Sequence, residues 1–113
     1  MKAAIVEDFP DWKEKITKEL ESHGINVVAK ATTKAQGIQL VSQLQKLGVQ
    51  VLILDGALDQ SSDDGNEIGK LCKQIAPDVL RVGMSRYPDG VTEVDIVVGK
   101  ENLNELAETI LSF

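Results

Sequence analysis

Aromatic side chains, cysteines and long apolar runs are all scarce in this chain. Phe, Trp and Tyr make up 4% of its 113 residues, so the core must be mainly aliphatic. The single cysteine, Cys72, cannot form an internal disulfide and lies in a helical apolar stripe, where we expect a buried core thiol. No apolar run approaches the roughly 18 residues of a membrane span, and acidic residues interrupt any apolar region of a signal peptide. The chain is therefore predicted to be cytoplasmic, without a membrane partner.

Basic residues are in the minority as well. The sequence has 12 Lys and Arg against 18 Asp and Glu, a net charge of −6. Nucleic-acid binding usually needs a basic patch, so we expect no nucleic-acid partner. No Gly-rich loop precedes a predicted helix, which disfavours nucleotide or flavin binding. The length fits one domain with one core, and residues 1–113 are predicted to be a single domain.

Short apolar segments alternate with helical patterns along the chain. The short segments are solidly apolar rather than alternating, which predicts strands that are covered on both faces. Strands that alternate with helices are typical of a doubly wound parallel sheet in a three-layer α/β fold. The five predicted strands are residues 2–6, 25–29, 49–54, 79–84 and 94–98.

Helices are predicted from apolar spacing and from residues that favour helix ends. Pro10 suits the first turn of a helix, and Thr33 suits the cap of a second helix that Gly48 closes. A further helix ends near Ile75, and the last one covers residues 101–112. The predicted inward-facing side chains are Ile38, Val41, Leu44 and Leu47 in the second helix, and Leu103, Leu106, Ala107, Ile110 and Leu111 in the last.

The connection between the fourth and fifth predicted strands is unusually short. It consists of residues 86–93, after Ser85, and contains Pro88 and Gly90. A parallel crossover usually takes about a dozen or more residues and includes a helix. We therefore expect the helix between the fourth and fifth strands to be short or missing.

Polar side chains follow four of the predicted strands. Glu7 and Asp8 follow the first, Asp55 the third, Ser85 the fourth and Lys100 the fifth. In open parallel sheets, ligands bind beyond these carboxyl ends. Two carboxylates about 4 Å apart repel by roughly 4 kcal/mol at an effective dielectric of about 20. Three converging carboxylates therefore indicate a bound cation, and oxygen ligands suit Mg²⁺.

Each of these residues also has a simpler interpretation. Asp8 could cap the helix that follows it, and Asp55 with Gly56 could form a plain turn at the end of a strand. Ser85 and Lys100 could be solvated loop residues. Each simpler interpretation explains one residue only, and all of them would have to be correct at once. The position of all these residues at strand ends therefore favours a functional site.

The set of residues at the strand ends resembles the receiver domain of response regulators in two-component signalling. The likeness covers nearly the whole chain. It rests on the pair Glu7-Asp8, on Asp55 in LILD, on Ser85 in VGMS and on Lys100 in VVGK. The resemblance implies a flavodoxin-like sheet with strand order 2-1-3-4-5.

The resemblance also implies a magnesium site. Asp8 and Asp55 would bind Mg²⁺ directly, and Glu7 would help through a water molecule. The backbone carbonyl of Ala57 would be a further ligand, a role that any side chain at that position allows.

The family's phosphoryl chemistry would fall on three side chains. Asp55 would accept a phosphoryl group from a histidine kinase or a phosphotransfer protein. Ser85 would donate a hydrogen bond to a phosphoryl oxygen, and Lys100 would pair first with Asp55 and then with the phosphoryl group. The protein would be a phosphoprotein that controls a downstream protein target, and at most it would promote its own phosphotransfer and dephosphorylation. Because the sequence ends at Phe113, we expect a stand-alone receiver.

The sequence departs from the family at several positions. Glu101 replaces the usual Pro after the Lys, Arg86 replaces a small residue after the Ser, and Val97 occupies the usual position of an aromatic switch residue. The alternative is accordingly a pseudo-receiver, a protein-interaction module that is not phosphorylated. Two other classes of protein with similar folds are disfavoured by Ala57. Aspartyl-phosphate phosphatases of the haloacid dehalogenase type need Asp at this position, and cobalamin-binding domains need His.

Overall fold

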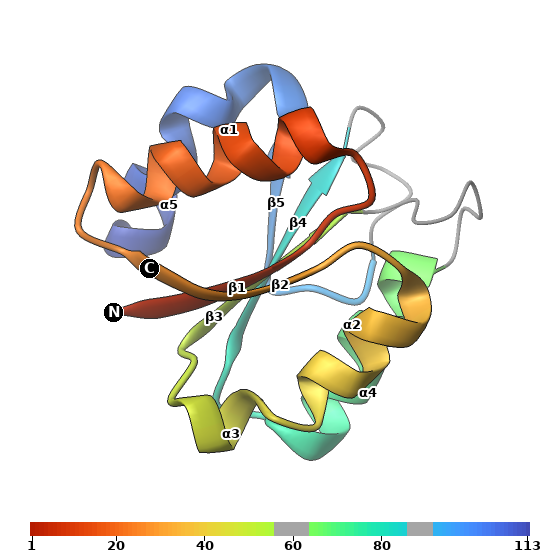
Figure 1. The fold of residues 1–113 in the computed structure, drawn as a ribbon. Coiled ribbons are helices and arrows are strands. Elements are labelled where there is room, and N and C mark those ends of the chain that lie inside the picture. The colour runs from red at the N-terminus through yellow and green to blue at the C-terminus, as the bar shows by residue number, and fades with distance from the viewer. Residues whose placement is uncertain (56–63, 86–91) are drawn as a thin grey trace.

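The middle layer of the protein is a five-stranded parallel sheet (Figure 1). The computed structural model describes residues 1–55, 64–85 and 92–113. The strands are β1 (Lys2–Val6), β2 (Asn26–Ala31), β3 (Val51–Asp55), β4 (Leu80–Ser85) and β5 (Ile96–Gly99). Their order in the sheet is β2-β1-β3-β4-β5, so the predicted three-layer fold and strand order are confirmed.

Helices cover both faces of the sheet (Figure 1). One face is covered by α1 (Pro10–Glu21) and α5 (Leu106–Ser112), with the 3₁₀ segment η3 (Lys100–Glu105) leading into α5. The other face is covered by α2 (Lys34–Val41), α3 (Leu44–Leu47) and α4 (Asp64–Ile75). None of the described helices has the length and apolarity needed to cross a membrane.

Buried side chains form two clusters, one on each face of the sheet. In β1, Ala3 and Ile5 belong to the cluster under α1 and α5, whereas Ala4 and Val6 belong to the cluster under α2 and α4. This alternation explains why the strand is apolar at every position. Cys72 is fully buried in the second cluster, as predicted, and burial raises the pKa of its thiol to about 11.

The second predicted helix is divided into two, which corrects the expectation of one continuous helix. α2 ends at Val41, and the hydroxyl of Ser42 donates a hydrogen bond to the carbonyl of Gln39, 2.6 Å away. Such side-chain bonds to the backbone compete with regular helix. The division also changes which side chains face inward: Ile38 is 42% exposed, contrary to prediction, while Val41 and Leu44 are buried. Leu47 is only partly buried.

The last predicted helix is likewise shorter than expected. Residues 100–105 form a 3₁₀ segment with non-helical backbone angles at Asn102, and only α5 is α-helical. Leu106, Ala107 and Ile110 are buried as predicted, but Leu111 is exposed. The sequence prediction applied one helical spacing to all of residues 101–112. Because the backbone is kinked at Asn102, a single spacing cannot predict which side chains are buried on both sides of the kink.

The connection from β4 to β5 is held by a buried arginine. Residues 92–95 form no helix, and residues 86–91 of the predicted short crossover lie outside the described part of the chain. The Arg81 guanidinium donates to the carbonyl oxygens of Glu93 and Gly69 at 3.0 and 3.2 Å, and to Asp95 Oδ1 at 3.1 Å. Burial alone would raise the pKa of Asp95, but the bonds from Arg81 outweigh it and lower that pKa. Arg81 therefore ties this connection to both β4 and α4.

Gly69 is predicted to be essential for this arrangement. A Cβ atom at position 69 would lie 2.2 Å from the carbonyl oxygen of Glu93, too close for any side chain. We expect Gly69→Ala to lower the free energy of unfolding by about 1–3 kcal/mol, the usual range for overpacking. Urea denaturation measures this. Lys70→Ala, on the exposed side of the same helix, is the control, and equal stability of the two variants would contradict the prediction.

Candidate functional site

Sheet register brings the predicted site residues to one edge. Val6 lies opposite Leu54 in the pairing of β1 with β3. Glu7 and Asp55 directly follow this pair, Glu7 just beyond β1 and Asp55 as the last residue of β3, so they lie side by side. Lys100 follows Gly99, the last residue of β5. The carboxyl ends of parallel strands meet at the same edge, as the sequence predicted.

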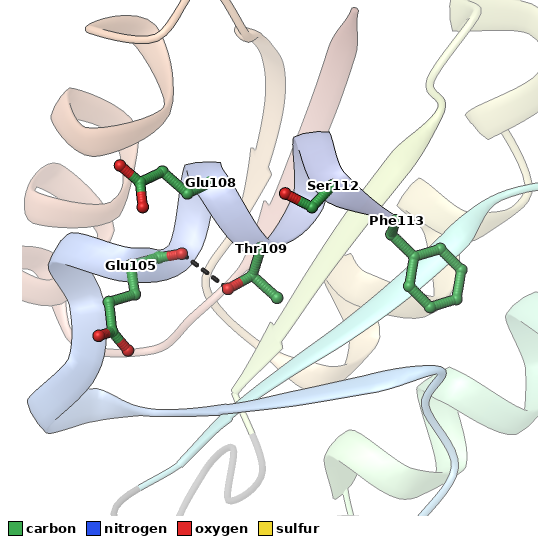
Figure 2. Close-up of a pocket in the computed structure, with 5 residues that line it drawn as sticks. All are labelled: Glu105, Glu108, Thr109, Ser112 and Phe113. Atoms are coloured by element: carbon green, nitrogen blue, oxygen red, sulfur yellow. Dashed lines mark hydrogen bonds between the residues drawn. The ribbon is translucent and has the colours of Figure 1, made fainter.

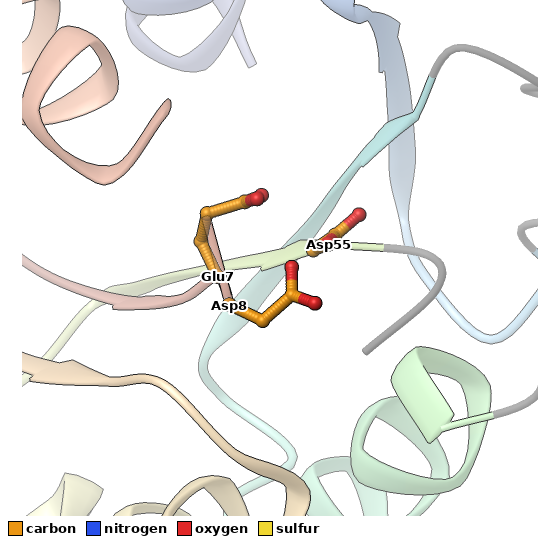
Figure 3. Close-up of side chains that lie close together, drawn as sticks. All are labelled: Glu7, Asp8 and Asp55. Carbon is orange, nitrogen blue, oxygen red and sulfur yellow. The ribbon is translucent and has the colours of Figure 1, made fainter. Parts of the chain in front are cut away.

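Three carboxylates converge at this edge (Figure 3). One oxygen each of Glu7, Asp8 and Asp55 lies within 4.8 Å of the others. Glu7 is 1% exposed and Asp55 6% exposed, while Asp8 is partly exposed. The N-cap of α1 is Phe9 rather than Asp8, so the alternative of Asp8 as the helix cap gains no support. The three residues, hereafter the acidic cluster, therefore form a group of nearby charges rather than a set of local caps.

Lys100 is the cation that lies next to the acidic cluster. Its Nζ is 3.4 Å from Glu7 Oε2 and 3.5 Å from Asp55 Oδ1. Its side chain is 11% exposed, so the ion pairs are shielded from water more than surface pairs are. One ammonium offsets only part of the charge of three carboxylates, and the cluster stays negative when all three are ionised.

Glu7 lies in an environment that disfavours its charged form. Burial, followed by the negative charge of Asp55, raises the pKa of Glu7 from its ordinary value of 4.5 to about 7, against the opposing effect of Lys100. Its Oε1 accepts a hydrogen bond from the backbone N–H of Phe9 at 3.3 Å. Its buried Oε2 accepts no hydrogen bond from the described residues. A buried oxygen that accepts no hydrogen bond is consistent with a site where a bound cation, or a water molecule on that cation, would contact it.

The donor set of the cluster fits Mg²⁺. Magnesium takes oxygen ligands and usually keeps several waters, with one or two carboxylates from the protein. Asp8 and Asp55 offer such carboxylates, and Glu7 Oε2, which is ion-paired with Lys100 but accepts no hydrogen bond from the described residues, could accept one from a coordinated water. Ala57, predicted as a ligand through its carbonyl, lies outside the described residues.

Ser85 is buried at the end of β4. Its neighbour Met84 lies opposite Asp55 in the pairing of β3 with β4, so Ser85 is one residue further toward the carboxyl edge. Both Asp55 and Ser85 are the last residues of their strands, whereas the sequence had placed them just beyond. Sheet pairing thus fixes their backbones more firmly than a loop would.

Trp12 is a neighbour of the site whose contact with Lys100 the sequence did not reveal. Lys100 Nζ lies 5.1 Å from the centroid of the Trp12 ring, and Lys15 Nζ lies 5.0 Å from it. Helical spacing could have predicted the contact with Lys15, three residues on. The contact with Lys100 depends on how the start of α1 faces the end of β5, which no local pattern encodes.

A shallow hollow of about 410 Å³ lies on α5, apart from the residues of the acidic cluster (Figure 2). Its polar groups are partly used within the helix, because the hydroxyl of Thr109 donates to the carbonyl of Glu105 at 2.8 Å. It contains no residue of the predicted site. The lining side chains are Glu105, Glu108, Thr109, Ser112 and Phe113.

Comparison with known proteins finds likeness in structure only. No family model matches the chain, and no curated protein matches its sequence. The RcsB response regulator of Salmonella typhimurium has a similar structure, with a TM-score of 0.81, 23% identity and 99% of this chain covered. This chain spans 58% of the length of that RcsB chain.

Two further solved structures extend the comparison. A CheY-like response regulator receiver domain protein from Methanospirillum hungatei JF-1 has a TM-score of 0.77 and 17% identity, with 98% of this chain and 90% of that chain covered. A response regulator from Burkholderia pseudomallei, solved with a phosphorylated aspartic acid and a calcium ion, has a TM-score of 0.76 and 17% identity, with coverages of 98% and 64%. The chain therefore has the fold of a receiver domain, as its sequence predicted.

The raised pKa of Glu7 predicts how the stability of the metal-free protein depends on pH. A carboxyl with a higher pKa in the folded state loses stability as it ionises, so the penalty grows from about pH 4.5 to about pH 7 and then remains. Gln resembles the protonated form. We expect Glu7→Gln to increase the free energy of unfolding by roughly 1–3 kcal/mol at pH 8 in EDTA.

The increase should shrink to about half or less at pH 5.5, where little of the penalty has developed. Urea denaturation of both proteins at the two pH values measures the change. Glu14→Gln, on the exposed surface of α1, is the control. An increase that is equal at both pH values would show that ionisation of Glu7 is not its cause.

Proposed function

We propose that residues 1–113 form a single phosphorylation-dependent receiver of two-component signalling that acts in the cytoplasm. Asp55 accepts a phosphoryl group from a histidine kinase or a phosphotransfer protein, with Mg²⁺ bound, and the change controls a partner protein rather than nucleic acid. The observation that carries the proposal is the convergence of Glu7, Asp8, Asp55 and Lys100 at the carboxyl edge of a receiver-type sheet.

The proposed chemistry is a transfer of one phosphoryl group. A carboxylate oxygen of Asp55 forms a bond to phosphorus as the bond from phosphorus to the donor breaks, and the electron pair leaves with the donor. Such transfers depend on positioning and charge neutralisation more than on a strong base. The Lys100 ammonium, 3.5 Å from Asp55, neutralises charge on the acceptor side. Ser85 donates a hydrogen bond to a phosphoryl oxygen.

The magnesium ion would supply the rest of the neutralisation. Asp8 and Asp55 would hold it, Glu7 would accept from one of its waters, and the carbonyl of Ala57 is proposed as a further ligand. The chain itself promotes only its own phosphotransfer and dephosphorylation, so it is a signalling domain and not an enzyme acting on other substrates. A similar fold holds both a phosphorylated aspartic acid and a metal ion in the Burkholderia pseudomallei protein, which supports the proposal.

Phosphorylation would change the charge balance of the site. It adds roughly 1.5 to 2 negative charges next to Lys100 and Ser85. Lys100 is the first residue of η3, and Ser85 is the last residue of β4. Drawing them toward the phosphoryl group would shift the population of two conformations of the domain, and a partner would read that shift.

A pseudo-receiver is the second candidate. Its support is Glu101 in place of Pro, Val97 in place of an aromatic residue, and the absence of a helix in residues 92–95. These features lie on the path by which a signal would leave the site, and they do not touch the acidic cluster. We therefore favour phosphorylation of Asp55.

Phosphorylation can be tested by intact-mass analysis. With Mg²⁺ and acetyl phosphate, we expect the wild-type protein to gain one phosphoryl group and Asp55→Asn to gain none, because the amide oxygen is a poor nucleophile. Asp78→Asn, at an exposed position after α4, should behave like wild type. Absence of any Asp55-dependent adduct with several donors, including phosphorylated histidine carriers, would favour the pseudo-receiver.

Magnesium binding can be followed through Trp12, the single tryptophan of the chain. Bound Mg²⁺ would compete with Lys100 for Glu7 and Asp55, and Lys100 lies against the Trp12 ring. We expect saturable titration of the fluorescence with Mg²⁺. Asp8→Asn should weaken the affinity by about tenfold or more, since a charged ligand is lost. The same affinity in wild type and Asp8→Asn would remove Asp8 from the proposed ligand set.

A further inference from the structure

Besides two acidic residues, the ammonium of Lys100 lies near an aromatic ring. Its distances to Glu7 and Asp55 are 3.4 and 3.5 Å, longer than the roughly 2.7–2.9 Å of a strong charge-assisted hydrogen bond. The ammonium also donates a hydrogen bond to Glu7 Oε1 at 3.5 Å, so its contacts with these carboxylates are all long. The ring of Trp12, 5.1 Å from Nζ, is within the range of about 6 Å at which an aromatic face attracts a cation.

The backbone around Trp12 is more regular than that around Lys100. Trp12 lies in the first turn of α1, where Pro10 begins the helix and the backbone N–H of Lys13 bonds to the carbonyl of Phe9 at 3.0 Å. Lys100 begins a 3₁₀ segment that contains the non-helical residue Asn102. A long, flexible side chain on a less regular segment thus contacts an aromatic ring on a regular helix. The Trp12 ring is therefore better suited to position the Lys100 side chain than the reverse.

Packing does not account for the position of Trp12. The side chain is partly exposed. Neither of the two apolar clusters that the described residues form includes it, although both include other residues from the strands and helices around it. The ring lies close to two ammonium groups, those of Lys15 and Lys100. Of these two, Lys15 is exposed and Lys100 is largely buried, so the contact with Lys100 is the less hydrated one.

We propose that Trp12 is a positioning residue, whose aromatic face holds the Lys100 ammonium between Glu7 and Asp55. The consequence for phosphoryl transfer rests on the function proposed above, whereas the contact itself does not. Desolvated contacts of this kind are the stronger ones. With the ammonium already in place, less rearrangement of Lys100 is needed when charge develops on the phosphoryl group.

Substitutions of Trp12 can distinguish the effect of an aromatic ring from the effect of a large apolar side chain. At saturating Mg²⁺, we expect Trp12→Leu to slow phosphorylation of Asp55 by acetyl phosphate about three- to tenfold, and Trp12→Phe to restore most of the rate. Lys15→Met, which removes the other ammonium, should leave the rate unchanged. Equal rates for Trp12→Leu and wild type would overturn the inference, and equally slow Leu and Phe variants would show a role in packing only.

A second measurement needs no phosphorylation and no Trp12 variant. In metal-free protein, we expect Lys100→Met to change the intensity or wavelength of Trp12 emission, Lys100→Arg to preserve most of the wild-type signal, and both to remain folded by circular dichroism. If Lys100→Met leaves the emission unchanged while Lys15→Met alters it, Lys15 is the only significant cation and the inference fails.

The two measurements also separate this inference from the proposed function. If wild-type protein forms no adduct on Asp55, the proposed function fails, and the emission of the Lys100 variants still decides whether the ring holds the ammonium. If the adduct forms at the same rate with Leu at position 12, the proposed function stands and the positioning role of Trp12 fails.

Discussion

Mutual repulsion among Glu7, Asp8 and Asp55 is the constraint around which this structure is arranged. Backbone pairing holds the carboxylates together, because β1 and β3 are adjacent strands whose ends are level and whose side chains are buried in both core clusters. Burial of Ile5, Val6, Ile53 and Leu54, at about 1.5–3 kcal/mol each, offsets much of the cost of this repulsion. The core therefore keeps the acids together, and they do not stabilise the core in return.

Lys100 relieves this repulsion only in part, and the raised pKa of Glu7 reflects first the burial of its carboxylate and then the remaining repulsion from Asp55. A fully compensated carboxyl would have a pKa at or below its ordinary value, whereas that of Glu7 rises to about 7. Residual negative charge of this kind disfavours the folded protein near neutral pH and favours any cation that can bind. The same excess of negative charge thus lowers the stability of the folded protein and favours the binding of a cation. Binding sites commonly differ from cores in this way.

The parts of the structure that the sequence predicted are those with a local or periodic signal. Solid apolar runs predicted β1 and β3, Pro10 predicted the start of α1, and Thr33 predicted the cap of α2, where its hydroxyl accepts from the N–H of Gln36. The direction and order of parallel strands then placed Glu7, Asp8 and Asp55 at one edge.

The features that the sequence did not predict depend on competition or on distant contacts. Ser42 bonds to a backbone carbonyl and ends α2, although the apolar spacing continues beyond it. The Arg81 side chain in β4 is buried because two carbonyl oxygens and Asp95 receive its hydrogen bonds. A sequence pattern marks an arginine within a strand as an exposed position, and only the tertiary structure shows the acceptors. The contact of Trp12 with Lys100 belongs to the same class.

Arg81 also bears on how a change at the site could reach a partner. The described part of the β4–β5 connection is fixed to α4 through Gly69 and to β4 through Asp95, and the side chain of Asn66 accepts the N–H groups of Thr92 and Glu93. Residues 92–95 are therefore held in place by bonds that do not involve the acidic cluster. A signal from Asp55 that travels through Ser85 would have to act before this anchored segment, whereas one that travels through Lys100 would act after it. The start of η3, where Lys100 lies against Trp12, comes after this anchored segment and after β5, and it is in direct contact with Glu7 and Asp55.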